Sequence, residues 1–185
     1  GMVAEAQGNL PALNTILDTC EKLAPDNPWV KTQLAHRREQ LNPEQAIAQR
    51  EADRKKNPKD TANLAALAAL YHRARKTNEA LKIYAECHDL EPANVSVAER
   101  YTALLTANRD YAAAEQALEK TSQAIDPKDN KLRASVQLMK AALIFNRTRA
   151  EHAGEISPAE RAKVDEAFIE ATKMGAFDYV LKPFE

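Results

Sequence analysis

The chain has 185 residues, and its 26 Lys and Arg nearly balance its 27 Asp and Glu, which gives a formal net charge of −1. That length suits one compact domain or a short repeat array, and the near-neutral charge argues against nucleic acid or an anionic membrane as a partner. Glycine is scarce at 4 residues, while alanine, leucine and glutamate are common, so the composition predicts an almost entirely helical protein.

The sequence gives few indications of its compartment. It contains no window of about 18 apolar residues, so no membrane-spanning helix is predicted. Its first residues do not resemble a signal peptide, which slightly favours the cytoplasm. Gly1 before Met2 is the pattern that a removed purification tag leaves, so we expect the natural protein to be longer.

Four prolines recur along the chain at a nearly constant interval. Pro25, Pro58, Pro92 and Pro127 lie 33, 34 and 35 residues apart, and each is followed two residues later by Asn or Asp. Proline disfavours helical geometry in the residue before it, and Asn and Asp are good helix N-caps. The pattern therefore predicts that one helix ends before each proline and that the next begins after each Asn or Asp. A period of about 34 residues is typical of helix–turn–helix repeats.

In chain order, the first predicted element is a single helix within 9–25, the second half of a repeat. A degenerate helix pair follows at 27–60, where Arg37 and Arg50 stand at positions expected to be large and apolar. Cys20 and a second cysteine, Cys87, occupy equivalent repeat positions roughly 20 Å apart, at about 10 Å per helix layer. A disulfide requires Cα atoms within about 7 Å, so we interpret both as small packing residues.

The two central repeats, 61–94 and 95–128, carry the most specific pattern. Their small and large apolar positions are Leu64, Leu67, Ala68, Tyr71, Ala80, Tyr84, Cys87, Tyr101, Leu105, Ala114 and Leu118. Over residues 58–127 this pattern resembles the tetratricopeptide repeat family. The resemblance implies an all-α fold, a right-handed superhelical α-α solenoid of antiparallel helix pairs, forming a single domain over 1–185.

The last elements depart from the repeat. A divergent helix pair is predicted at 129–175, and a terminal helix or tail at 176–185. The stretch from Met174 to Phe184 resembles the end of a two-component receiver domain, with Lys182 at the position of its lysine. The upstream strands and acidic residues that a receiver needs are absent, so we interpret the match as coincidental or as a packing tail.

Signals of catalysis or metal binding are missing from the sequence. No phosphate-binding, dinucleotide-binding, zinc-protease or nucleophile-elbow motif occurs, and none of the four histidines is spaced with another His or Cys for a metal. We therefore expect neither an enzyme nor a cofactor. A tetratricopeptide subclass holds the C-terminal carboxylate of chaperones with Lys, Asn and Arg. Ala65, Ala69, Glu99 and Ala103 stand where that clamp would begin, so chaperone-tail binding is not expected.

The resemblance implies a scaffold that binds a peptide or protein in a concave groove lined by the first helix of each pair. Basic residues at the predicted groove positions suggest, as a hypothesis, an acidic partner segment. These residues are Lys31, Arg38, His72, Arg73, Arg100, Arg133 and Lys140. The alternative is a structural or self-assembly role, with the array packing through its apolar ends, or an accessory role in a longer multidomain protein.

Overall fold

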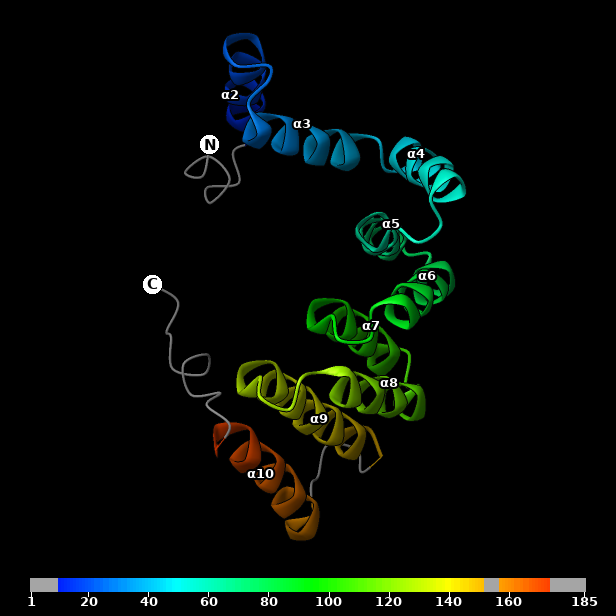
Figure 1. The fold of residues 1–185 in the computed structure, drawn as a ribbon, viewed down its shortest axis with the longest axis vertical. Helices are drawn as coiled ribbons and strands as arrows, with labels where there is room; N and C mark the ends of the chain where they lie inside the picture. Colours follow the sequence, from blue (N-terminus) through cyan, green and yellow to red (C-terminus); the bar gives the residue numbers. More distant parts are fainter. Residues whose placement is uncertain (1–9, 152–156, 174–185) are drawn as a thin grey trace. The chain divides into compact units, whose positions relative to one another are not determined.

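The computed structural model describes residues 10–151 and 157–173, and within these ranges it contains helices and turns without a β-strand (Figure 1). The helices are α2 (Leu10–Leu23), α3 (Pro28–Leu41), α4 (Pro43–Lys56), α5 (Thr61–Arg73), α6 (Thr77–Leu90), α7 (Val95–Ala107), α8 (Tyr111–Ala124), α9 (Asn130–Glu151) and α10 (Pro158–Lys173). The expected all-α helical repeat fold is confirmed. The predicted tail at 176–185 and the receiver-like stretch from Met174 to Phe184 lie outside the described residues.

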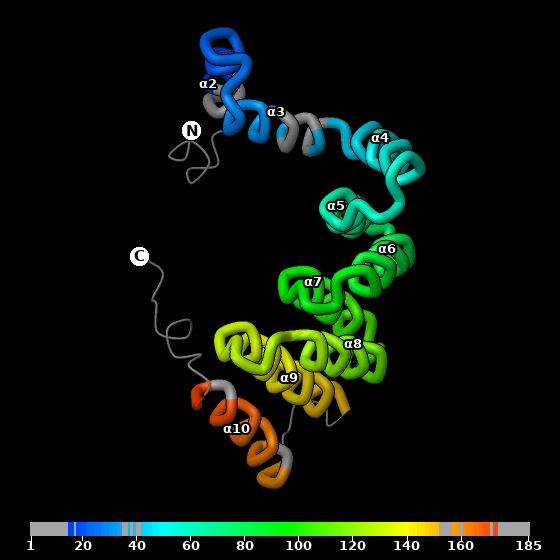
Figure 2. Tube along the Cα trace, in the orientation of Figure 1, coloured from blue at the N-terminus to red at the C-terminus, as the bar shows by residue number. Residues whose placement is uncertain are grey.

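The chain divides into two compact units, Gly1–Lys55 and Lys56–Glu185. In the second unit the repeat is regular: α5 and α7 each have 13 residues, and α6 and α8 each have 14. Each helix from α5 to α9 packs against the next one, as the tube in Figure 2 lets the reader follow. Two successive helix–turn–helix units are thus stacked directly on one another.

The predicted N-caps are present at the four repeat boundaries. Asp60 accepts a hydrogen bond from the backbone N–H three residues later at 3.0 Å, and Asn94 does the same at 3.3 Å. The equivalent bonds of Asn27 and Asp129 are 3.3 and 3.0 Å long. Each cap satisfies a backbone donor that the helix itself leaves open, which fixes the residue at which the helix begins.

The core of the second unit consists of the apolar positions that define the repeat. Tyr71 and Tyr101 are half-buried, and the remaining positions of the sequence pattern are buried. The buried members are Leu64, Leu67, Ala68, Ala80, Tyr84, Cys87, Leu105, Ala114 and Leu118. Full burial of one leucine stabilises the fold by about 1.5–3 kcal/mol. Alanine between the helices lets their backbones approach closely, so the leucines of neighbouring helices can interlock.

The helices α9 and α10 differ from the preceding repeats. Helix α9 has 22 residues, and α10 packs on it with Val164 buried at 7% exposure. On α10, Phe168 and Ile169 remain 41% and 51% exposed. This last helix therefore covers α9 but leaves apolar side chains of its own in solvent.

In the first unit, ion pairs occupy the positions where the repeat pattern requires apolar residues. Arg37 contacts Asp18 at 2.6 Å, linking α3 to α2, and Arg50 of α4 forms a hydrogen-bonded ion pair with Glu39 of α3. The small apolar core here consists of Val30 and Leu34 with Cys20 packed against them. The two unexpected arginines thus connect helices through carboxylates instead of through apolar contacts.

Candidate functional site

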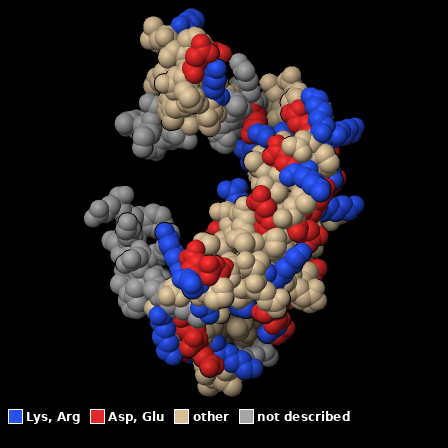
Figure 3. All heavy atoms as spheres, in the orientation of Figure 1, with Lys and Arg blue, Asp and Glu red and all other residues tan. Residues whose placement is uncertain are grey.

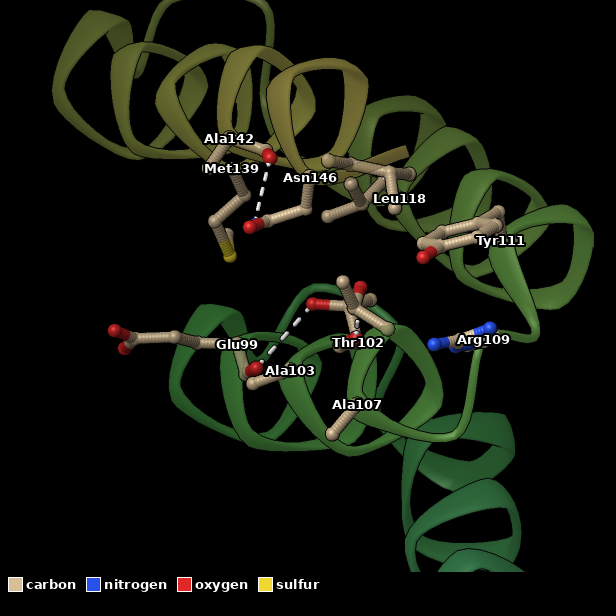
Figure 4. A pocket seen from close by; sticks show the side chains of 12 residues that line it. Glu99, Thr102, Ala103, Ala107, Arg109, Tyr111, Leu118, Met139, Ala142 and Asn146 are labelled. Atoms are coloured by element: carbon tan, nitrogen blue, oxygen red, sulfur yellow. Dashed lines mark hydrogen bonds between the residues drawn. The ribbon is translucent and has the colours of Figure 1, made fainter. Parts of the chain in front are cut away.

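A cleft of about 570 Å³ lies in the second unit between α7 and α9, with α8 behind it (Figure 4). It is formed by the first helices of two successive repeats. Its lining residues are Glu99, Thr102, Ala103, Thr106, Ala107, Arg109, Tyr111, Leu118, Met139, Ala142, Leu143 and Asn146. Pockets of this size are typical of sites that bind ligands.

The α7 wall is built from small residues at helical spacing. Glu99, Thr102, Ala103, Thr106 and Ala107 recur every three or four positions, so they share one face of α7. The hydroxyls of both threonines donate to carbonyl oxygens of the preceding turn, at 2.8 and 2.7 Å. Because each hydroxyl has already donated its single hydrogen to the helix, it can only accept a hydrogen bond from a ligand. The wall therefore offers methyl groups, space and hydroxyl acceptors.

The opposite wall and the floor combine apolar contacts with one polar group. Leu118 on α8 is fully buried at 0% exposure, and Met139 on α9 is half-buried above it. Asn146 donates its side-chain N–H to the carbonyl of Ala142 at 2.9 Å, as the dashed line in Figure 4 marks. Its amide oxygen accepts no hydrogen bond from any described residue and is available to a ligand.

The two ends of the cleft carry opposite charges. Figure 4 shows Glu99 at one end and Arg109 at the other. Both residues are exposed, and neither side chain forms an ion pair within the part of the chain that the structure describes. Arg109 lies in the α7–α8 turn with φ at 62°, a left-handed conformation that costs most residues roughly 1–2 kcal/mol.

Several charges on α8 and α9 are paired across helices. Three salt bridges join the pairs Asp89–Lys120, Glu119–Lys140 and Glu115–Arg147, at 2.6, 2.9 and 3.5 Å. The hydrogen bond from the Lys140 ammonium lowers the pKa of the Glu119 carboxyl, which therefore stays ionised as the pH falls. On the visible face, Lys and Arg alternate with Asp and Glu (Figure 3). Glu99 and Arg109 take no part in these pairs.

The predicted groove residues of the second unit lie outside the lining of this cleft. His72 and Arg73 are exposed in the last turn of α5, and Arg100 is exposed on α7. Arg133 donates to the carbonyl of Pro127 at 3.1 Å. Lys140, the remaining prediction in this unit, is the partner of Glu119 described above.

Two predicted residues belong to the first unit. Lys31 is exposed on α3 and contacts Asp26 at 2.9 Å. Arg38 lies on the same helix, but its side chain is outside the described residues. His72 and Arg73 are adjacent in the sequence and share the last turn of α5. Their role in binding stays a prediction.

A second hollow, of about 640 Å³, lies within the first unit between α3 and α4. Its lining is polar: Glu39, Asn42, Gln45, Ala46, Gln49, Arg50 and Asp53. The Glu39–Arg50 ion pair crosses it, and Gln49 donates to Asp53 at 3.1 Å, so its charged groups are engaged with one another. This arrangement connects two helices and offers less to a ligand than the α7–α9 cleft.

The described residues were compared with the requirements of a metal site and of a reactive thiol. No group of three or more His, Cys, Asp or Glu side chains among them is placed to hold a metal ion. Burial, reinforced by the charges of Glu91 and Glu86, raises the pKa of the Cys87 thiol to about 11, so it stays protonated and is a poor nucleophile at neutral pH. Both cysteines are free thiols. Within the described ranges, every helix is too short or too polar to cross a membrane.

Several lining residues were not predicted from the sequence. The sequence pattern placed Arg109 in a turn and Met139 on an apolar helix face, but it did not predict Glu99, Ala103, Arg109, Met139 or Asn146 as binding residues. The spacing of small residues on α7, four of them between positions 102 and 107, was the available signal. Alanine and threonine carry no charge, so the distribution of basic residues does not reveal this wall.

No protein-family model matches the sequence, and no curated protein is significantly similar to it. Among solved structures, a tetratricopeptide repeat protein from Parabacteroides merdae ATCC 43184 is 18% identical, with a TM-score of 0.46, over 94% of this chain and 70% of that one. The MamA RS-1 ArsTM double mutant is 15% identical, with a TM-score of 0.45, over 80% of this chain and 94% of that one. These likenesses concern the fold alone and do not indicate what the chain binds.

Proposed function

We propose that this chain is a protein-binding scaffold that holds a short peptide segment of its partner in the α7–α9 cleft. The observation that carries the proposal is the cleft itself, about 570 Å³ in volume, with small residues on one wall and an apolar floor. Alanine and threonine walls permit the backbone of a peptide to approach closely. The free amide oxygen of Asn146 can accept a hydrogen bond from a peptide N–H.

The proposal predicts that filling the cleft abolishes peptide binding. Ala103 lines the cleft and is exposed, so Ala103→Trp adds volume in the cleft without entering the core. Peptides of twelve residues are selected from a random displayed library on the unmodified chain, and their affinities are then measured by calorimetry. We expect Ala103→Trp to weaken them by about tenfold or more, since the indole occupies the space of ligand side chains.

Ala112→Trp is the matched control. Ala112 is also an exposed helical alanine, on α8, but it does not line the cleft. Its replacement should leave the affinity of the selected peptides unchanged. Selected peptides that bind the Ala103→Trp protein as tightly as the unmodified one would place their site elsewhere and refute the proposal.

A second candidate function is self-assembly through the last described helix. It is supported by the exposed apolar side chains of Phe168 and Ile169 on α10. Such side chains are commonly buried when a repeat array continues or associates with a copy of itself. The two candidates can coexist, because α10 does not line the cleft.

A further inference from the structure

Glu99 and Arg109 limit what can occupy the cleft, because each is an unpaired charge at one of its ends. A segment lying along the cleft between α7 and α9 meets a carboxylate at one end and a guanidinium at the other. We infer that the cleft selects an extended peptide that carries an acidic residue for Arg109 and a basic residue for Glu99. This inference rests on the proposed function and specifies the chemistry of its ligand.

The distance between the two charges sets the spacing in the ligand. Glu99 and Arg109 are ten positions apart, and α7 connects them up to its end at Ala107. At about 1.5 Å per helical residue, the two ends are roughly 15 Å apart. An extended chain advances about 3.3 Å per residue, so the acidic and basic residues of the ligand should be about five positions apart.

The lining in the middle of the cleft determines which ligand residues fit between the acidic and the basic residue of the ligand. Ala103 and Ala142 on opposite walls leave room, and Met139 offers a flexible apolar surface. Asn146 contributes one acceptor for a backbone N–H of the ligand. We therefore expect small or medium apolar residues between the acidic and the basic residue.

Local structure holds Arg109 in position for this role. Its own N–H donates to the carbonyl of Thr106 at 3.0 Å, and the N–H of Asp110 donates to that of Leu105 at 2.9 Å. These bonds fix the turn from which the guanidinium extends. A guanidinium with no competing carboxylate can bind a ligand carboxylate through two parallel hydrogen bonds, the strongest kind of polar contact available here.

The test reverses the charges of Glu99 and Arg109 and determines the order of acidic and basic residues in the peptides that are then selected. The double variant Glu99→Arg, Arg109→Glu keeps a β-carbon at residue 109, so the backbone strain of the turn is unchanged. The same random twelve-residue library is selected separately on the unmodified chain and on the double variant. We expect an acidic and a basic residue about five positions apart in both sets of peptides, in opposite order.

Affinities of the defined peptides complete the test. Peptides selected on the unmodified chain should bind the single variant Arg109→Glu about tenfold or more weakly, since a charged hydrogen bond is lost and a repulsion introduced. Arg75→Glu is the matched control. Arg75 occupies the equivalent turn of the preceding repeat, 34 residues earlier, with φ at 59°, and it does not line the cleft. Its reversal should not change the affinity.

The possible results separate this inference from the proposed function. In one outcome, the selected peptides bind Ala103→Trp weakly, but their acidic and basic residues have no fixed order, or the same order on the unmodified chain and on the double variant. That outcome overturns the inference and leaves the proposed function standing. If no selected peptide loses affinity in the Ala103→Trp protein, both the inference and the proposed function are overturned. Thermal melting of each variant verifies that a loss of binding is not a loss of folding.

Discussion

At the scale of single residues, His88 and Thr121 form a buried polar pair between α6 and α8. The His88 Nε2 atom lies 2.8 Å from Thr121 Oγ1, and the threonine hydroxyl donates its own hydrogen to the carbonyl of Ala117 at 3.0 Å. Since that hydroxyl has a single hydrogen, its bond to Ala117 assigns the Nε2–H tautomer to His88, with Nε2 as the donor. His88 is only 2% exposed, so this hydrogen bond satisfies a donor that water cannot reach.

Protonation of His88 opposes folding. Burial lowers the pKa of His88 below its ordinary value, the positive charge of Lys120 lowers it further, and Asp89 acts in the opposite direction. As the pH falls below about 6.5, the unfolded chain binds a proton that the folded chain does not. We therefore expect the free energy of unfolding, measured with urea, to decrease as the pH falls from 6.5 toward the lower pKa of the folded state.

His88→Gln supplies the control, because an amide can donate to Thr121 and does not titrate. As the pH falls over that range, the free energy of unfolding should decrease more for the unmodified chain than for His88→Gln. A difference independent of pH between 7.5 and 5 would contradict the assignment. Thr121→Val, which leaves the His88 donor unpaired, should cost about 1–3 kcal/mol at neutral pH.

At the scale of helices, equivalent positions of the two central repeats differ in their N-caps. Asp110, the N-cap of α8, accepts a hydrogen bond from the N–H of Ala113, while Lys76, the N-cap of α6, makes no side-chain cap bond. Their backbones are nearly the same, with φ and ψ of −87° and 68° at Asp110 and of −90° and 69° at Lys76. An aspartate can therefore occupy position 76 without rearrangement.

We expect Lys76→Asp to raise the free energy of unfolding by about 1 kcal/mol. The carboxylate would satisfy an open N–H in the first turn of α6 and would interact favourably with the helix dipole. Urea denaturation of both proteins measures the difference. Lys76→Ala removes the lysine without adding a cap and should change the stability little; an equal gain from both substitutions would show that capping is not the cause.

The helices were predictable from the sequence because local chemistry defines them. Proline followed two residues later by Asn or Asp fixed the ends of α4, α6 and α8 and the starts of their successors, and the caps of Asp60 and Asn94 confirm it. The lining of the cleft was less predictable. It depends on the packing of α7 beside α9, two helices separated by the whole of α8, and on the direction taken by Arg109 from a turn.

At the scale of the whole molecule, the exposed apolar side chains of α10 predict self-association. We expect light scattering to give a mass above the 20.5 kDa of one chain, increasing with concentration. Phe168→Glu should lower that mass, because it places a charge where apolar contact would form.

Lys163→Glu is the control on the same helix, since Lys163 is exposed and also charged. It should leave the dependence of mass on concentration unchanged. A mass of one chain at every concentration would exclude this second candidate function. Peptide binding in the α7–α9 cleft is measured independently of that result.

The length of α9 connects two parts of the molecule. Its 22 residues make it about 33 Å long, against about 20 Å for the 13 residues of α7. One rigid helix therefore serves both as a wall of the cleft and as the surface on which α10 packs. Any change that a bound ligand makes in the free energy of α10 packing must equal the change that α10 packing makes in the free energy of ligand binding, because coupling between two sites is reciprocal. The element through which such coupling would pass is α9, since the cleft and the last helix share it.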